Sequence, residues 1–234
     1  MRLLTPTIVA AILAAIISPI ATGQDYRTAR QNMVTKQILT RGISNPAVLK
    51  AVRTVPRHLF VPEDRQGSAY EDRPVPIGYG QTISQPFIVA YMTEIIDPSK
   101  HHRVLEVGTG SGYQAAVLAE IVDSVYTIEI VPELAESAER RLKDLGYDNV
   151  RVLNADGYHG WEEYAPFDAI VVTAAAEHVP PPLVAQLGNS RRMVIPVGTP
   201  FLVQSLVLVE KHRDKMKTSS LMPVRFVPFT RRKN

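Results

Sequence analysis

The residues best suited to chemistry are an acid and a set of glycines that follow one apolar segment. Glu106 lies two residues before Gly108, and Gly110 and Gly112 complete an alternating pattern. A strand, a glycine turn and a helix together bring bare backbone close to a nucleotide-like ligand. A glycine turn that only joins a strand to a helix is the alternative interpretation.

The spacing of this turn narrows the choice of ligand. In the dinucleotide pattern the third glycine comes one residue later, and the helix that follows is aimed at a pyrophosphate. The Glu106 carboxylate, just before the turn, would repel a pyrophosphate but would attract a cation. The motif therefore favours S-adenosylmethionine, through its amino-acid part, over a nicotinamide dinucleotide.

Two more acids stand at the ends of the next predicted strands. Glu129 belongs to the strand predicted over 124–130, about twenty residues after the glycine turn, where an acid can accept hydrogen bonds from ribose hydroxyls. Asp156 follows the strand predicted over 150–154, and its carboxylate could accept a hydrogen bond from an adenine amino group. Each acid alone is typical of a solvated loop, but acids at the ends of successive strands favour a binding site.

These residues require an α/β fold in which the strand ends meet at one edge. We expect a Rossmann-like, doubly wound, mostly parallel sheet, because apolar β-rich segments alternate with helical patterns. The 234 residues suffice for one domain over 24–234, with helices and a substrate loop in 24–100 and the cofactor-binding sheet in 101–234. The pattern predicts helices at 26–42, 46–52, 88–96, 113–122, 133–145 and 183–187, and strands at 104–107, 124–130, 150–154, 167–173, 192–198, 204–211 and 221–229.

A polar segment upstream of the glycine turn is the second candidate for function. Residues 76–87 combine two glycines with hydroxyl and amide side chains, which pack poorly in a core but suit a hydrogen-bonding loop. Ser84 stands just before the helix predicted over 88–96. It is therefore either a helix N-cap or a hydroxyl that faces a ligand.

The first 23 residues differ in kind from the rest of the chain. Arg2 precedes a mostly apolar stretch, and Ala21 and Gly23 form a small-x-small site before Gln24. This composition predicts a signal peptide, so that export to the periplasm is expected if it is cleaved. An uncleaved membrane anchor and a wrongly assigned start codon are the alternatives. The absence of cysteine fits either compartment.

Composition and motifs disfavour several other functions. A net charge of +3 gives no strong attraction to nucleic acid, and the cysteine used by carbon-5 cytosine methyltransferases is absent. His178 has no second histidine or carboxylate at metal-ligand spacing, so we expect no metal. No serine lies in a G-x-S-x-G elbow, which disfavours an α/β-hydrolase. A nicotinamide dehydrogenase, a methyltransferase that acts on a small molecule and a non-catalytic binding module stay as alternatives.

Segments along most of the chain together resemble the protein-L-isoaspartate O-methyltransferase family. The resemblance covers about residues 28 to 230, and the glycine motif within it indicates only the wider methyltransferase class. The segment 81–86 is specific to this family. The family is typically cytosolic, so the N-terminal segment leaves the compartment open. The segments that carry the resemblance are 78–86, 104–114, 167–175 and 224–228.

The resemblance implies methyl transfer from S-adenosylmethionine to the free carboxylate of L-isoaspartyl residues in damaged proteins and peptides, which begins their repair. It implies an active-site hydroxyl at Ser84, ribose binding by Glu129, and adenine binding by Asp156 and Gly157. Independently of the resemblance, we expect a monomer without nucleic-acid partners, which contacts a membrane only through residues 1–23 if these are not cleaved. The resemblance implies that the methionine part of the cofactor is bound by the turn residues Glu106, Gly108, Thr109, Gly110, Ser111 and Gly112. It further implies contacts with substrate or cofactor by Thr82, Ile83, Gln85 and Thr230.

Overall fold

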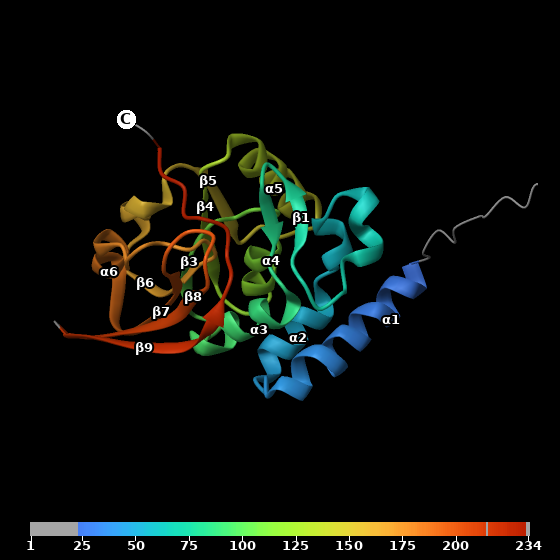
Figure 1. Ribbon diagram of the computed structural model, residues 1–234, viewed down its shortest axis with the longest axis horizontal. Coiled ribbons are helices and arrows are strands. Elements are labelled where there is room, and N and C mark those ends of the chain that lie inside the picture. Colours follow the sequence, from blue (N-terminus) through green and yellow to red (C-terminus); the bar gives the residue numbers. More distant parts are fainter. Residues whose placement is uncertain (1–22, 214, 233–234) are drawn as a thin grey trace, which may run out of the picture.

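The computed structural model describes residues 23–213 and 215–232, and its centre is a seven-stranded sheet in the order β5-β4-β3-β6-β7-β8-β9 (Figure 1). The strands from β3 to β7 run parallel, and β8 and β9 are antiparallel. The predicted fold class is confirmed. The strands are β3 Arg103–Val107, β4 Ser124–Glu129, β5 Val150–Asn154, β6 Phe167–Val172, β7 Leu187–Val197, β8 Gln204–His212 and β9 Lys215–Val224.

The direction in which the chain adds strands changes at β3. From β3 it adds β4 and then β5 on one side, and it returns with β6 on the other side of β3. In open α/β sheets, ligands bind at such a switch point, outside the carboxyl ends of the strands. The candidate acids at those strand ends therefore lie where this fold binds its ligands.

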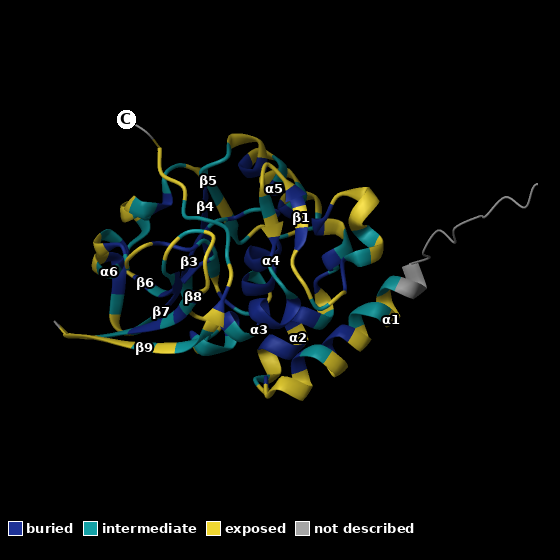
Figure 2. Cartoon of the chain, in the orientation of Figure 1, coloured by how far each residue is buried: buried dark blue, intermediate teal, exposed yellow. Residues whose placement is uncertain are grey.

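The two faces of the sheet are covered unequally. Side chains from α1 to α5 pack with one set of strand residues into a large apolar cluster, whereas α6 and short 3₁₀ turns cover the opposite face. Figure 2 shows that the central strands β3, β4 and β6 are buried, whereas β9 at the edge of the sheet is largely exposed. The helices are α1 Gly23–Met33, α2 Pro46–Thr54, α3 Pro86–Ile95, α4 Tyr113–Ala119, α5 Pro132–Asp144 and α6 Pro181–Gln186.

The helix predicted over 26–42 is a helical run of changing geometry. α1 passes directly into a π-helix at Val34–Ile38 and a 3₁₀ turn at Leu39–Arg41, and the run ends at Gly42, as predicted. The predicted cap of α2 is also confirmed, because Asn45 Oδ1 accepts a hydrogen bond from the backbone N–H of Ala47 (2.9 Å).

The segment 76–87, predicted to be a loop, instead contains a short hairpin. β1 (Val75–Gly78) pairs antiparallel with β2 (Gln81–Ile83), and α3 follows two residues later. The pairing forms because Val75 and Ile77 alternate with exposed neighbours and bury their side chains on one face. Ile77 reaches the glycine turn, since a Cβ placed on Gly110 would lie 3.3 Å from Ile77 Cδ1. The hairpin therefore lies against the turn.

The strand predicted over 221–229 is wrong in its bounds. β9 is the second half of a hairpin with β8, in which Gln204 pairs with Val224 at the far end. The chain then leaves the sheet, because Phe226 N–H donates to Gln204 Oε1 (2.9 Å) and Phe229 N–H donates to Ala175 O (2.8 Å). This departure carries the C-terminal segment across the strand ends.

Two other predicted bounds are corrected. α4 ends at Ala119 rather than Val122, where the backbone N–H of Ile121 turns back to Leu118 O (2.9 Å). β7 begins at Leu187, directly after α6, rather than at Arg192.

The segment predicted to be a signal peptide or anchor lies outside the described residues except for Gly23, where α1 begins. Within residues 23–213 and 215–232, no helix combines the length and the apolar character needed to cross a membrane.

Candidate active site

The glycine turn lies against the end of β6. Gly108 follows β3 with a φ of +99°, and its N–H donates to Ile128 O (2.8 Å). The hydroxyl of Thr173 donates to Gly108 O (2.6 Å), and a Cβ on Gly108 would collide with this hydroxyl oxygen. Any other residue would be strained and would push the two strand ends apart. The turn therefore presents bare backbone at the switch point.

Glu106 is fully buried beneath the turn. Its Oε2 accepts a hydrogen bond from the hydroxyl of Thr127 (2.5 Å), which is in turn hydrogen-bonded to Thr109 (2.7 Å). Its Oε1 has no partner among the described residues. Burial raises the pKa of Glu106 to about 8; the hydrogen bond from Thr127 opposes the rise, and the negative charge of Glu129 adds to it. A buried acid with a free oxygen is suited to a cationic group.

Glu129 stabilises the turn itself. Its two carboxylate oxygens accept hydrogen bonds from the backbone N–H groups of Gly110 (2.8 Å) and Val131 (3.0 Å). The carboxylate also lines a cavity at the strand ends. A carboxylate offers about four lone-pair sites, so these two bonds leave acceptor capacity toward the cavity.

The structure gives Asp156 and Gly157 different surroundings. The Asp156 carboxylate accepts hydrogen bonds from Arg231 Nε (2.8 Å) and from the backbone N–H of Tyr158 (3.0 Å). Burial alone would raise the pKa of Asp156, but these bonds outweigh it and hold the pKa below its usual range. Gly157, and not Asp156, lines the cavity, and a Cβ on Gly157 would collide with Val107.

Two adjacent spaces, which share lining residues, lie beside the turn. The larger, about 550 Å³ and open to solvent, is lined by Glu129 and Gly157 and, on another side, by Thr230 and its neighbours in the C-terminal segment. The smaller, about 330 Å³, lies over Glu106 and includes Ser84. Residues common to both are Thr82, Gly108, Gly110 and Thr173; Ile83, Thr109 and Ser111 line the smaller space.

Ser84 stands between the smaller cavity and an apolar groove. It lies between β2 and α3, and the N-cap position of α3 is Gln85, so the N-cap interpretation of Ser84 is wrong. The groove is lined by Ser84 together with apolar side chains that include Phe87, Val203 and Phe226. The serine that the sequence singles out is therefore brought next to the buried acid and the glycine turn.

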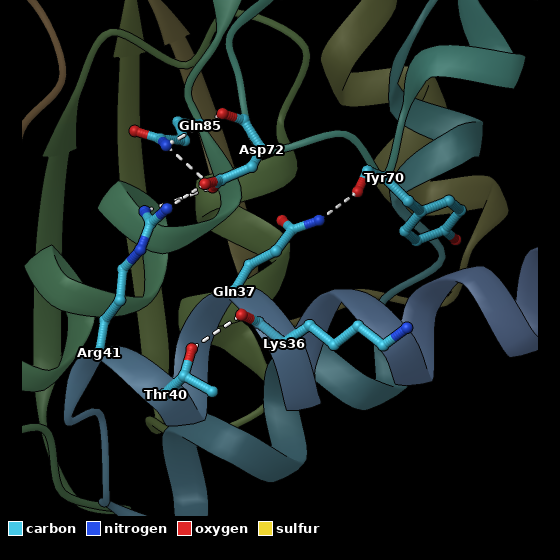
Figure 3. A network of polar contacts seen from close by, with 7 residues as sticks. All are labelled: Lys36, Gln37, Thr40, Arg41, Tyr70, Asp72 and Gln85. Atoms are coloured by element: carbon cyan, nitrogen blue, oxygen red, sulfur yellow. Dashed lines mark hydrogen bonds and ion pairs between the residues drawn. The ribbon is translucent and has the colours of Figure 1, made fainter.

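Gln85, the residue that follows Ser84, is held by hydrogen bonds to Asp72 (Figure 3). Its Nε2 donates to the backbone oxygen (3.0 Å) and to Oδ1 (2.8 Å) of Asp72. Asp72 also forms an ion pair with Arg41, at the end of the N-terminal helical run. The amide group of Gln85 is engaged in these contacts, although the side chain also lines the groove.

Known proteins resemble this chain over nearly all of its length. The profile described as Protein-L-isoaspartate(D-aspartate) O-methyltransferase (PCMT) matches residues 28–234. Protein-L-isoaspartate O-methyltransferase 2 of Syntrophobacter fumaroxidans is 56% identical over 220 residues, which cover 90% of this chain and 89% of that protein. The protein-L-isoaspartate O-methyltransferase of Gloeobacter violaceus is 55% identical over 201 residues, which cover 86% and 98%.

The chain belongs to the PCMT family. A solved protein-L-isoaspartate O-methyltransferase matches it with a TM-score of 0.78 and 28% identity, over 87% of this chain and 65% of the other. A Plasmodium falciparum protein assigned the same activity, in complex with S-adenosyl-L-homocysteine, matches with a TM-score of 0.72 and 25% identity, over 88% and 98%. This PCMT protein is a methyltransferase that uses S-adenosylmethionine to esterify isoaspartyl residues of proteins.

The site fits this cofactor on two observations of the structure. The unpartnered, buried Oε1 of Glu106 is suited to an ammonium group, and the turn at Gly108 lets a ligand approach the backbone. Within the described residues, no group of three or more histidine, cysteine or acidic side chains could hold a metal ion, and the expectation of a metal-free reaction stays a prediction.

Some residues that line the candidate site carry no signal that the sequence analysis used. Thr173 follows a buried strand and faces the glycine turn, and this position after a strand end is a signal that could have found it. The groove residues Val203 and Phe226 are more than a hundred positions from Ser84, and no local pattern connects them.

Proposed function

We propose that methyl transfer takes place where the Glu106 cavity meets the apolar groove, and that Ser84 orients the isoaspartyl carboxylate there. The supporting observation is that Ser84 lines both spaces, together with Thr82 and Thr173. An isoaspartyl side chain that reaches from the groove into the cavity passes the Ser84 hydroxyl.

The reaction requires Ser84 only to donate a hydrogen bond. A carboxylate with a pKa of about 3 to 4 is ionised at neutral pH, so the acceptor needs no general base. S-adenosylmethionine, when bound, supplies a methyl group already activated on a sulfonium. Among the described residues, Ser84 Oγ has no hydrogen-bond partner that would make it a nucleophile, so the hydroxyl is free to donate to the acceptor carboxylate. Positioning alone can supply up to about 7–11 kcal/mol.

We propose the following contacts to the cofactor. Glu106, through its free Oε1, binds the ammonium group, and Glu129 accepts hydrogen bonds from the ribose hydroxyls. Gly157 packs against adenine and Asp156 accepts from its amino group, while Thr230 closes the cavity. Thr109 and Ser111 contribute through their backbone, which alternates with that of Gly108, Gly110 and Gly112 and shapes the turn.

The groove is the proposed binding place for the substrate segment. Its apolar lining, next to Ser84, suits a flexible protein segment that carries the damaged residue. Thr82 lies on the boundary between the groove and the cavity and contacts the substrate. Ile83 is buried and Gln85 is held by Asp72, so we assign both to the shape of the site rather than to direct hydrogen bonding.

The function is tested with labelled S-adenosylmethionine and two peptides that differ only in an aspartyl or isoaspartyl linkage. Label should enter the isoaspartyl peptide alone and should be lost in base, as expected for a methyl ester. Equal labelling of both peptides, or labelling of a small molecule in preference to either, would overturn the assignment.

Ser84→Ala tests the role of the serine. It should lower kcat with the isoaspartyl peptide by about tenfold or more, since one hydrogen bond to a charged group is lost, and it should leave the affinity for S-adenosyl-L-homocysteine unchanged. Ser219→Ala, on β9, is the matched control. Full turnover of Ser84→Ala with normal cofactor binding would contradict the role.

The compartment and the assembly are also proposals. We propose that residues 1–23 direct the enzyme to the periplasm or anchor it, and that the enzyme is a monomer without nucleic-acid partners. The intact mass of the protein from its own cells reports cleavage between Ala21 and Gln24. Light scattering reports the assembly, and a full-length mass in the cytosolic fraction would contradict export.

A further inference from the structure

Arg57 is a fully buried cation outside the groups assigned above. Its Nε donates to Ala69 O (2.6 Å) and its Nη2 donates to Ser84 O (2.7 Å). Its guanidinium carbon lies 4.8 Å from the centre of the Tyr113 ring. Burial lowers the pKa of Arg57 to about 10, so the side chain is still charged at neutral pH.

A buried charge with these partners needs an explanation. Among the described residues, no carboxylate forms an ion pair with Arg57, and Nη1 has no hydrogen-bond partner. Removing an unpaired cation from water is costly, and an apolar residue of similar size would fill the same space without that cost. We therefore attribute the presence of this arginine to the contacts that its guanidinium makes with Ala69, Ser84 and Tyr113.

The guanidinium joins the two sides of the active site. Ser84 belongs to the acceptor segment, whereas Tyr113 is the first residue of α4, directly after Gly112 of the cofactor turn. Arg57 itself comes from a separate 3₁₀ turn, Arg57–Phe60, which is adjacent in sequence to neither side. One planar, rigid group thus sets the distance between the serine backbone and the start of the cofactor helix.

We propose that Arg57 is a positioning residue for methyl transfer, which places the Ser84 hydroxyl relative to the glycine turn. This inference rests on the proposed role of Ser84. Arg57 binds the backbone oxygen of Ser84, and the Ser84 side chain itself makes no hydrogen bond among the described residues, so the position of the backbone decides where Oγ lies. In-line displacement is sensitive to small displacements, and a shift of about 1 Å can cost about a hundredfold in rate.

The first experiment compares Arg57→Lys and Arg57→Gln with Val55→Ala. Lysine keeps the charge but lacks the fork that reaches two carbonyl oxygens, and glutamine keeps one donor group without the charge. Val55 is a buried apolar residue two positions before Arg57 that lines neither the cavities nor the groove, so its variant reports the effect of lost packing. We expect both Arg57 variants to lose about tenfold or more in kcat per folded site, with the affinity for S-adenosyl-L-homocysteine within about threefold of the parent.

A double-mutant cycle then tests whether Arg57 acts through Ser84. If it does, Arg57→Lys should cost little in a Ser84→Ala background, because the hydroxyl that it positions is already gone. Methylguanidine added to Arg57→Ala should also restore part of kcat without changing cofactor affinity. Additive losses in the cycle would overturn the positioning role. It would also be overturned if the loss of activity in the Arg57 variants were fully explained by their unfolded fraction, as is expected for Val55→Ala. A Ser84→Ala enzyme with full activity would instead overturn the proposed role of Ser84.

Discussion

The two sides of the proposed active site, the cofactor side around Glu106 and Glu129 and the acceptor side around Ser84, are built in different ways. On the cofactor side, buried acids bind neighbouring backbone and hydroxyl groups, as Glu129 does with Gly110 and Glu106 does with Thr127. On the acceptor side, partly exposed side chains from distant segments meet at a groove, and a surface ion pair between Arg41 and Asp72 supports it. A change on the cofactor side should therefore act strongly on cofactor binding, whereas a change on the acceptor side should act in a graded way on substrate binding.

The strongest test of this contrast is Gly108→Ala. The added Cβ collides with Thr173 Oγ1, and the residue must also keep a φ of +99° that alanine rarely adopts. We expect cofactor affinity, measured by calorimetry with S-adenosyl-L-homocysteine, to fall by about a hundredfold or more.

Gly146→Ala is the matched control for Gly108→Ala. Gly146 also has a positive φ, of +81°, but no atom lies within 4 Å of its added Cβ. This control should lose about 1 kcal/mol of stability from backbone strain and should bind cofactor normally. Equal loss of binding in both variants would show that strain, and not the contact with Thr173, accounts for the effect.

The next test is the pH dependence of cofactor binding. Because the pKa of Glu106 is about 8 in the free protein, the acid is mostly protonated at neutral pH, and a bound cation must displace that proton. Affinity should therefore rise with pH between about 6 and 8, by at most about tenfold per unit, and level off above that range. Glu106→Gln should bind at least about tenfold more weakly at pH 8 and lose the slope. An unchanged slope in that variant would assign the proton to another group.

Stability should change with pH in the opposite sense. The folded state holds a proton on Glu106 between pH 4.5 and about 8 that the unfolded chain has lost, so the unfolding free energy falls as pH rises through this window. Glu106→Gln should remove this loss and raise the melting temperature at pH 8. Glu136→Gln, on the exposed side of α5, is the control and should leave the pH profile as it is.

The same contrast explains what the sequence could predict. The glycine turn and its acids follow one another in consecutive strand–helix units, so the spacing of Glu106, Glu129 and Asp156 predicts that all three lie at the same edge of a parallel sheet. The partner of Asp156 could not be read in this way, because Arg231 lies 75 residues away and reaches it only after the chain leaves β9. Arg57 is missed for the same reason, since nothing near it in sequence distinguishes a buried arginine from an exposed one.

On the acceptor side, Asp72→Asn should have a smaller effect. It weakens the ion pair with Arg41 and one of the contacts that hold Gln85. Partly exposed pairs contribute up to about 1 kcal/mol, so the KM for an isoaspartyl peptide should rise by no more than about fivefold, with cofactor affinity unchanged. Asp64→Asn, which alters the more exposed pair with Arg65, is the control and should leave KM as it is. A loss of cofactor affinity in Asp72→Asn would contradict the separation of the two sides.

The smallest expected effect belongs to Arg231→Ala, at the boundary of the two sides. Arg231 holds the C-terminal segment to Asp156 and stacks on Tyr158, with its guanidinium carbon 3.6 Å from the ring centre. Since the preceding Thr230 lines the proposed cofactor cavity, release of this contact should lower cofactor affinity by about two- to fivefold, and added salt should produce part of the same loss in the parent enzyme. Arg140→Ala removes an equal charge from an exposed pair on α5 and should change nothing. Tighter binding by Arg231→Ala would mean that Arg231 competes with adenine for Asp156, and that the C-terminal segment must release this acid before the cofactor binds.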